Sequence, residues 1–142
     1  MIRIEIMTEK DVFVVFELEK KLIGSANQET IFKTLSSENL NYYLIFEDDQ
    51  VVGFLEGLII SPESEIYDIA VDEDYQRKGY AKKLMEYFID LSKQNGVETI
   101  LLEVNSNNIK AINLYNLFGF VEYGKRKNYY GDADAILMKK SF

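Results

Sequence analysis

Apolar and polar residues alternate along several short stretches of the chain, a period of two that predicts half-buried β-strands. Residues 2–6 place isoleucine at alternate positions, with Arg3 and Glu5 between them. Strands are also predicted at 41–47 and 51–60, which Asp48-Asp49-Gln50 joins into a hairpin. The remaining predicted strands cover residues 65–71, 98–104, about 119–130 and 133–140.

Helical spacing is clearest over residues 79–95. Apolar residues recur there at i, i+3, i+4, i+7 and i+8, while lysine and glutamate side chains occupy the opposite face. This apolar stripe consists of Ala81, Leu84, Met85, Phe88 and Ile89. Further helices are predicted at 8–23, 27–36 and 109–118, the last with Asn108 as its N-cap and Gly119 as its stop.

The order of these elements predicts an α/β fold built around a mixed sheet. The chain runs strand, two helices, three strands, helix, strand, helix and two strands. Because helix 79–95 connects strands 65–71 and 98–104, these two strands are expected to run parallel. With 142 residues, no repeat and no linker, residues 1–142 are expected to form one domain.

Residue types that are absent restrict the chemistry. The chain has no histidine and no cysteine, which excludes a Ser-His-Asp triad, a cysteine nucleophile and a zinc site of the usual ligands, so no metal is expected. Acid–base catalysis near neutral pH must then come from a carboxylate, a tyrosine, a lysine or water. Direct transfer between two bound substrates is favoured over an acyl-enzyme route.

Charge and hydropathy also restrict the partners. A net charge of −8 argues against direct nucleic-acid binding and suits a basic peptide or a polyamine. No apolar run approaches the ~18 residues of a membrane span, and the N-terminus lacks the apolar block of a signal peptide. Together with the lack of cysteine, this leads us to expect a cytoplasmic protein without a membrane partner. The oligomeric state is not predicted.

The turn between strand 65–71 and helix 79–95 has the features of an anion site. Gly79 and Ala81 allow backbone N–H groups at the start of the helix to approach a phosphate, and the helix dipole favours negative charge there. Arg77, Lys78 and Lys82 add positive charge. The turn has neither a Walker nor a Rossmann pattern. Taken alone, it could equally be a strand-to-helix turn with solvated charges.

The motif does not stand alone. The strand, the Q-x-x-G-x-A loop and the helix, followed by Asn108, Tyr115 and Gly119-Phe120, closely resemble the GNAT superfamily of N-acetyltransferases across nearly the whole chain. The last third is similar to the ribosomal-protein-alanine N-acetyltransferases. That similarity rests on Leu102-Glu103-Val104, Asn108, Ala111-Ile112, Leu114-Tyr115, Gly119-Phe120, Arg126, Asn128-Tyr129-Tyr130 and Asp134-Ala135.

The resemblance implies the GNAT fold, a mixed sheet of about seven strands with helices on both faces. It also implies a splay between strands 65–71 and 98–104, in which the pantetheine arm of acetyl-CoA lies. The backbones of Ile69, Ala70 and Val71 would pair with that arm, and Asn108 would contact the cofactor beyond the splay. An N–H at the end of the first of these strands would polarise the thioester carbonyl. The pyrophosphate would be held by Arg77, Lys78, Gly79, Tyr80, Ala81 and Lys82.

The same resemblance assigns general base to Glu103 and general acid to Tyr115. Glu103 closes an apolar strand, where we expect partial burial to raise its pKa toward a useful range. Without the resemblance, Glu103 is an ordinary strand-end glutamate and Tyr115 a core residue. If Glu103 is not the base, Asp68 acting through water is the alternative.

The acceptor implied by the resemblance is a peptide or protein N-terminus, such as the N-terminal alanine of a small-subunit ribosomal protein. An α-amine, with a pKa of ~7.7–8.0 against ~10.4 for lysine, also suits a single carboxylate base better. The family pattern is not matched by Ile23-Gly24-Ser25-Ala26-Asn27, Asn105, Ala133 and the short loop Gly131-Asp132-Ala133.

Because these departures lie where the acceptor should bind, two alternatives stay open. One is a GNAT enzyme for a lysine side chain, a polyamine or an aminoglycoside, which a wide acidic cleft would favour. A narrow groove lined by Arg126, Tyr129 and Tyr130 would favour a peptide terminus. The other is a non-catalytic acyl-CoA-binding sensor, or a subunit that needs a partner.

Overall fold

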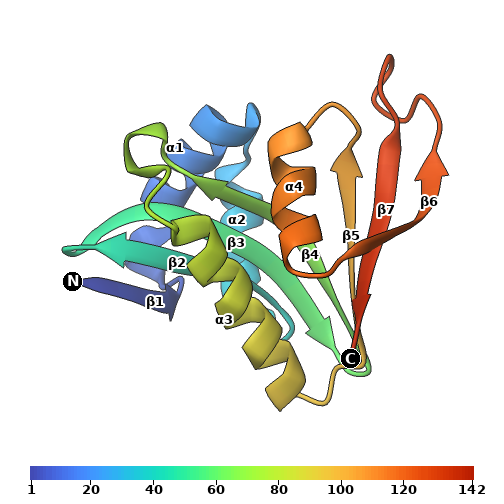
Figure 1. Ribbon diagram of the computed structural model, residues 1–142. Helices are drawn as coiled ribbons and strands as arrows, with labels where there is room; N and C mark the ends of the chain where they lie inside the picture. Colours follow the sequence, from blue (N-terminus) through green and yellow to red (C-terminus); the bar gives the residue numbers. More distant parts are fainter.

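Seven strands form one mixed sheet in the computed structural model, which describes residues 1–142 (Figure 1). The strand order is β1-β2-β3-β4-β5-β7-β6, and only β4 and β5 are parallel neighbours. The predicted number of strands and the parallel pair are thus confirmed. The strands are β1 (Ile2–Ile6), β2 (Leu40–Glu47), β3 (Gln50–Ile60), β4 (Glu63–Val71), β5 (Thr99–Asn105), β6 (Val121–Arg126) and β7 (Ala135–Ser141).

Helices cover both faces of this sheet, as predicted. On one face α1 (Val12–Ile23) and α2 (Gln28–Lys33) enclose a core of ten buried residues that includes Phe54. On the other face α3 (Tyr80–Gln94) and α4 (Ile109–Leu117) contribute to a core of 19 buried residues. None of these helices is long and apolar enough to cross a lipid bilayer.

Helix α3 has the amphipathic structure that its sequence predicts. Leu84, Met85 and Phe88 have no exposed surface, and Ile89 is also buried. The helix begins after Gly79, whose φ of 79° lies in the left-handed region that glycine adopts without strain. Burial of this stripe fixes α3 against the middle of the sheet and therefore fixes the position of its N-terminus.

The predicted boundaries fail mainly in the last hairpin. The strand predicted over about 119–130 ends at Arg126, and the chain then turns through residues 127–134 before β7. Asn128 and Gly131 both have positive φ there, and the Asn128 N–H donates to the Asp134 carboxylate at 2.9 Å. Two shorter differences are 3₁₀ turns at Glu9–Asp11 and Thr34–Ser36, within predicted helices; a third 3₁₀ turn covers Glu73–Tyr75.

The predicted splay lies between β4 and β5. Residues Glu63–Ile66 of β4 pair with Thr99–Leu102 of β5. Beyond these residues β4 has no partner on that side, and β5 continues to pair with β7. The pairing of β3 with β4 shifts just there, leaving Tyr67 as an extra residue in β4. Such a bulge bends its strand. The bend carries the second half of β4 away from β5, in agreement with the expected V-shaped gap.

A close contact between β3 and α3 leads to a test of this packing. A Cβ atom added at Gly57 would lie 2.3 Å from Cε1 of the fully buried Phe88 ring. We expect Gly57→Ala to lower the free energy of unfolding by about 1–3 kcal/mol, the usual cost of overpacking. Urea denaturation measures this loss. Combining Gly57→Ala with Phe88→Leu should cost less than the sum of the single changes; strict additivity would contradict the contact.

Candidate active site

A groove of about 600 Å³ lies where α3, α4 and the outer half of β4 meet. Nine of the ten residues predicted to bind the cofactor line it. The predicted pantetheine-binding segment, Ile69 to Val71, belongs to the part of β4 that has no β5 partner, so its backbone is available for pairing on that side. The other lining residues from the prediction are Arg77, Gly79, Tyr80, Ala81, Lys82 and Asn108.

The N-terminus of α3 provides the polar end of this groove. No side chain caps the helix, so the N–H groups of its first turn remain without helical partners. Arg77, Lys82 and Lys110 line the groove around them. Free N–H groups, the helix dipole and three cationic side chains together form an environment that suits a phosphate-bearing ligand.

Lys78 is the predicted cofactor residue that does not line the groove. Its Nζ lies 3.4 Å from a Glu47 carboxylate oxygen and 5.3 Å from the centroid of the Tyr75 ring. The Tyr80 hydroxyl donates to the same carboxylate, and this side chain is buried. Tyr80 therefore contributes to the groove while its hydroxyl is held by Glu47 at the end of β2.

Asn108 has a structural role as well as its place in the groove. Its side-chain oxygen accepts a hydrogen bond from the Ala111 N–H at 3.2 Å and so caps α4, as predicted. The cap fixes the first turn of α4 at the groove, and it leaves the side-chain amide N–H groups of Asn108 as donors toward a ligand.

Tyr115 lies on the buried face of α4. It is 5% exposed, its ring centroid lies 5.9 Å from that of Phe120, and its hydroxyl has no hydrogen-bond partner in the protein. Burial, and then the negative charge of Asp68, raise the pKa of Tyr115 well above the ordinary tyrosine value. The hydroxyl is therefore protonated throughout the neutral range, while the raised pKa also makes it a weaker acid than an ordinary tyrosine.

Glu103 is the first residue of β5 beyond its last pairing with β4, and so it lies at the splay. Its side chain is 35% exposed, and so partly buried as expected, but it lies 3.1 Å from Nη2 of Arg126, an ion pair that the sequence did not predict. Leu102 and Val104 occupy the buried face of the strand, so alternation directs Glu103 to the opposite face. Its environment is an ion pair instead of an apolar pocket.

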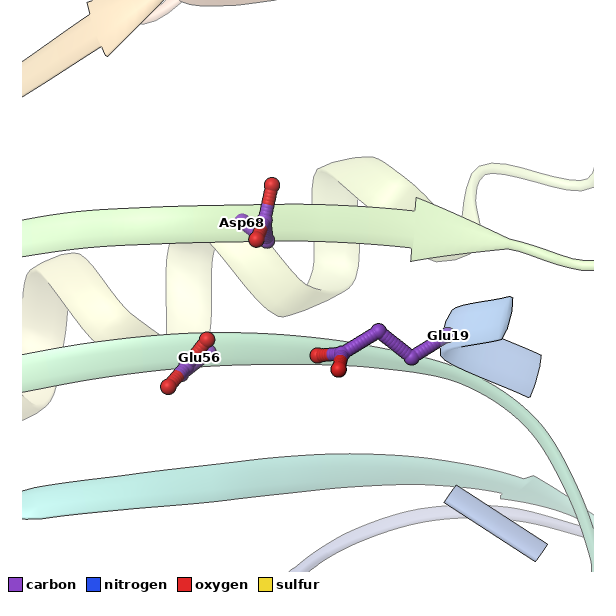
Figure 2. A group of neighbouring side chains, drawn as sticks. All are labelled: Glu19, Glu56 and Asp68. Atoms are coloured by element: carbon purple, nitrogen blue, oxygen red, sulfur yellow. The ribbon is translucent and has the colours of Figure 1, made fainter. Parts of the chain in front are cut away.

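A second hollow of about 410 Å³ lies on the α1–α2 side, and we call it the acidic pocket. It contains Glu19 from α1, Glu56 from β3 and Asp68 from β4, whose carboxylate oxygens lie within 4.8 Å of one another (Figure 2). The Tyr42 hydroxyl donates to Glu19 at 2.6 Å. No lysine or arginine forms an ion pair with any of the three carboxylates.

Uncompensated charge changes the proton affinity of this pocket. Burial, followed by the charges of Glu19 and Asp68, raises the pKa of Glu56 to about 7. Burial, followed by the charge of Glu19, raises the pKa of Asp68 to about 6. Three carboxylates at this spacing have the geometry to hold a cation, either a hard metal ion or an ammonium group.

Sequence reasoning missed Glu19 and Glu56 and named Asp68 only as an alternative base. The available signal was Glu56, a single charged residue inside the apolar run of 51–60. Glu19 carried no such signal, because a glutamate among the charged residues of a helix is usually solvated. Only the packing of α1 over β3 and β4 brings these side chains together.

The groove and the acidic pocket lie next to each other. Ile23 lines both, and Asp68 of the acidic pocket directly precedes Ile69 of the groove on β4. The site therefore joins a groove suited to an elongated phosphate-bearing ligand with a hollow suited to a cation. Such an arrangement can bring an activated acyl group and an amine together at the splay.

Comparison with known proteins identifies the family. Residues 16–120 match the acetyltransferase (GNAT) family. The ribosomal protein bS18-alanine N-acetyltransferase of Salmonella typhimurium is 34% identical over 140 residues, which are 95% of this chain and 94% of that protein.

Solved structures agree with this assignment. The crystal structure of the ribosomal-protein-S18-alanine N-acetyltransferase from Escherichia coli matches 99% of this chain and 94% of that one, with a TM-score of 0.90 and 30% identity. Ard1 from Thermoplasma volcanium matches 99% of this chain and 97% of that one, with a TM-score of 0.88 and 29% identity. The chain therefore belongs to the GNAT family and is an acetyl-CoA-dependent N-acetyltransferase.

Proposed function

We propose that this enzyme acetylates the α-amine of a protein N-terminus, with an N-terminal alanine as the first candidate. The observation that carries the proposal is the similarity to bS18-alanine N-acetyltransferases, which extends over nearly the full length of both chains at 34% identity. The splay supports it, because it opens between the groove and the acidic pocket and so allows two substrates to meet directly.

On the donor side, the pantetheine arm of acetyl-CoA pairs with the backbone of Ile69 to Val71, the segment of β4 that β5 leaves free. The pyrophosphate binds at the N-terminus of α3, where Arg77 and Lys82 flank the free N–H groups. Asn108 contacts the cofactor at the start of α4. Lys78 does not line the groove, and it contributes to the donor site only indirectly, through its ion pair with Glu47.

The reaction is an attack of the neutral amine on the thioester carbonyl carbon, after which the carbon–sulfur bond breaks. Tyr115 donates its proton to the departing thiolate, a role that suits a buried hydroxyl with no partner inside the protein. The base is one of two carboxylates at the splay, Glu103 on β5 or Asp68 on β4.

One observation favours a second candidate acceptor, a small polycation such as a polyamine. The acidic pocket has three carboxylates without a basic partner, and their negative charge attracts cationic amines. The residues expected to line a peptide groove are arranged differently: Arg126 is paired with Glu103, while Tyr129 and Tyr130 are largely exposed. The acceptor experiment below distinguishes the two candidates.

We expect an alanine-initiated peptide to be acetylated and the same peptide with a blocked N-terminus and free lysines to be left unmodified. The physical reason is the lower pKa of an α-amine, which leaves more neutral nucleophile at pH 7. Mass spectrometry locates the acetyl group, with spermidine assayed in parallel. Equal rates on both peptides would contradict α-amine selectivity, and faster turnover of spermidine would favour the second candidate.

The anion site is tested by a matched pair of substitutions at Gly79. Asp and Asn both tolerate left-handed φ and have nearly the same shape, so Gly79→Asp and Gly79→Asn differ mainly in charge. Two like charges ~4 Å apart near a protein surface repel by about 4 kcal/mol. We expect the Asp variant to bind acetyl-CoA at least about tenfold more weakly than the Asn variant in calorimetric titration. Equal affinities would place the pyrophosphate elsewhere.

Tyr115→Phe separates catalysis from packing. The substitution keeps the ring against Phe120 and removes a hydroxyl that has no hydrogen-bond partner in the protein, so the melting temperature should not fall. If Tyr115 is the acid, kcat should drop by about 10²–10⁴-fold with unchanged acetyl-CoA affinity. Near-normal turnover combined with a lower melting temperature would instead show that the tyrosine is structural.

A further inference from the structure

We propose that Arg126 is a positioning residue for the reaction: its guanidinium holds the Glu103 carboxylate at the splay and ties it to the β6–β7 turn. This inference rests on the proposed function, in which Glu103 is one of the two candidate bases. Arg126 itself exchanges no proton, because a guanidinium stays protonated at every pH at which an enzyme can be assayed.

The two side chains meet across β7, which lies between β5 and β6 in the sheet. Asn105 of β5 pairs with Ala135 of β7, which pairs in turn with Arg126 of β6. Glu103 lies two residues before Asn105 and therefore on the same face. Two strand spacings of ~4.8 Å separate β5 from β6, so the ion pair forms only because Arg126 reaches across β7. The residue of β7 in its row is Ala135, whose single methyl group leaves room for the guanidinium to cross.

Arg126 is the only cation that forms an ion pair with the Glu103 carboxylate. Its Nη2 lies 3.1 Å from a Glu103 oxygen, and no lysine forms a second pair. On the other side of β5, burial and then the charge of Glu103 raise the pKa of Glu65 on β4. Repulsion from Glu65 and attraction to Arg126 therefore act on the carboxylate in the same sense. Without Arg126, no charged group of the protein would hold Glu103 in place.

This ion pair is too exposed to serve mainly in stability. The side chain of Arg126 is 56% exposed and that of Glu103 is 35% exposed. Exposed pairs contribute little to the free energy of unfolding, because solvent screens the charges and two long side chains lose conformational freedom. Orientation has a larger effect on rate, since misplacing a reacting group by ~1 Å can cost about 10²-fold. The pair is therefore better explained by the positioning of a reacting group.

Arg126 also contacts the turn between β6 and β7. Its Cζ lies 5.7 Å from the centroid of the Tyr129 ring, and the edge of one ring meets the other between Tyr129 and Tyr130, with centroids 5.1 Å apart. Burial, and then the charge of Glu103, raise the pKa of Tyr130, so this side chain lies within the field of the same carboxylate. Glu103, Arg126 and the two tyrosines thus form one connected cluster.

The turn is itself fixed to the end of β5. The Asp134 N–H donates to the Ser106 hydroxyl at 3.0 Å, and the Ser106 N–H donates to the Asp134 carbonyl at 2.9 Å. The Asp134 carboxylate accepts from the Asn128 N–H inside the turn. Ser106 directly follows β5, so the turn, Arg126 and Glu103 lie at the same end of the sheet (Figure 1). These contacts position the candidate base and the turn as one unit.

The test is a double-mutant cycle in kcat between Arg126→Gln and Glu103→Gln, measured on the acceptor that the wild type uses best, peptide or polyamine. We expect Arg126→Gln to lower kcat by about 10–10²-fold with unchanged acetyl-CoA affinity. In the Glu103→Gln background the same change should cost less than about twofold, because Arg126 acts through Glu103. Arg126→Lys should keep more activity than Arg126→Gln, since an ammonium group still pairs with a carboxylate although it lacks the fork geometry.

Lys125→Gln is the matched control, because it removes one positive charge from the neighbouring, exposed position of β6. Lys125 pairs with Ile136 and so belongs to the other face of the sheet, and its variant should match the wild type in kcat. Amide hydrogen exchange provides a readout that does not depend on activity. Residues 127–134 should exchange faster in Arg126→Gln and in Glu103→Gln than in the wild type or in Lys125→Gln, because both changes release the turn from β5.

Equal losses of kcat from Arg126→Gln in both backgrounds would overturn the inference, because the two residues would then act independently. A higher KM for the acceptor at unchanged kcat would overturn it as well, since Arg126 would then only contact the acceptor. Normal kcat in Glu103→Gln would remove the base that Arg126 is proposed to position, and it would leave the proposed acceptor untouched. Inactivity of the wild type on peptides and on spermidine would contradict the proposed function instead. Hydrogen exchange would still decide the inference in that case, and unchanged exchange in both variants would overturn it.

Discussion

The separation of β4 from β5 after Ile66 and Leu102 is the constraint on which the rest of the site depends. Parallel strands normally continue to pair, and an unpaired stretch of backbone inside a sheet leaves hydrogen-bonding groups without partners. The bulge at Tyr67 bends β4, while β7 takes over the free side of β5. The unpaired backbone is then confined to one strand, where an extended ligand can pair with it.

The unpaired half of β4 lies beside two hollows, the groove and the acidic pocket. Helices α3 and α4 and the end of α1 line the groove, and α1 with the loop to α2 lines the acidic pocket. The two hollows share Ile23 and have neighbouring residues of β4 in their walls. Asp68 lines the acidic pocket, and the next three residues of β4, Ile69 to Val71, line the groove.

Electrostatics distinguishes the two hollows as clearly as shape does. The groove ends at a helix N-terminus with Arg77 and Lys82, in a chain whose net charge is −8. The acidic pocket gathers three carboxylates without a cation. The two hollows therefore differ in the sign of the charge that they attract: the end of the groove favours an anionic group, and the acidic pocket favours a cationic one.

The sequence by itself determined the elements of the fold and indicated the anion site at the start of α3. Period-two strands, the apolar stripe of α3 and the Gly79 turn are local signals, so these features could be predicted from them, whereas the other predicted groove residues followed from the resemblance to a family. Other features depend on contacts between residues far apart in the chain. These features are the ion pair of Glu103 with Arg126, the ion pair of Lys78 with Glu47 and the proximity of Glu19 to Glu56. Side-chain direction and charge compensation are set by packing, so only the tertiary structure decided them.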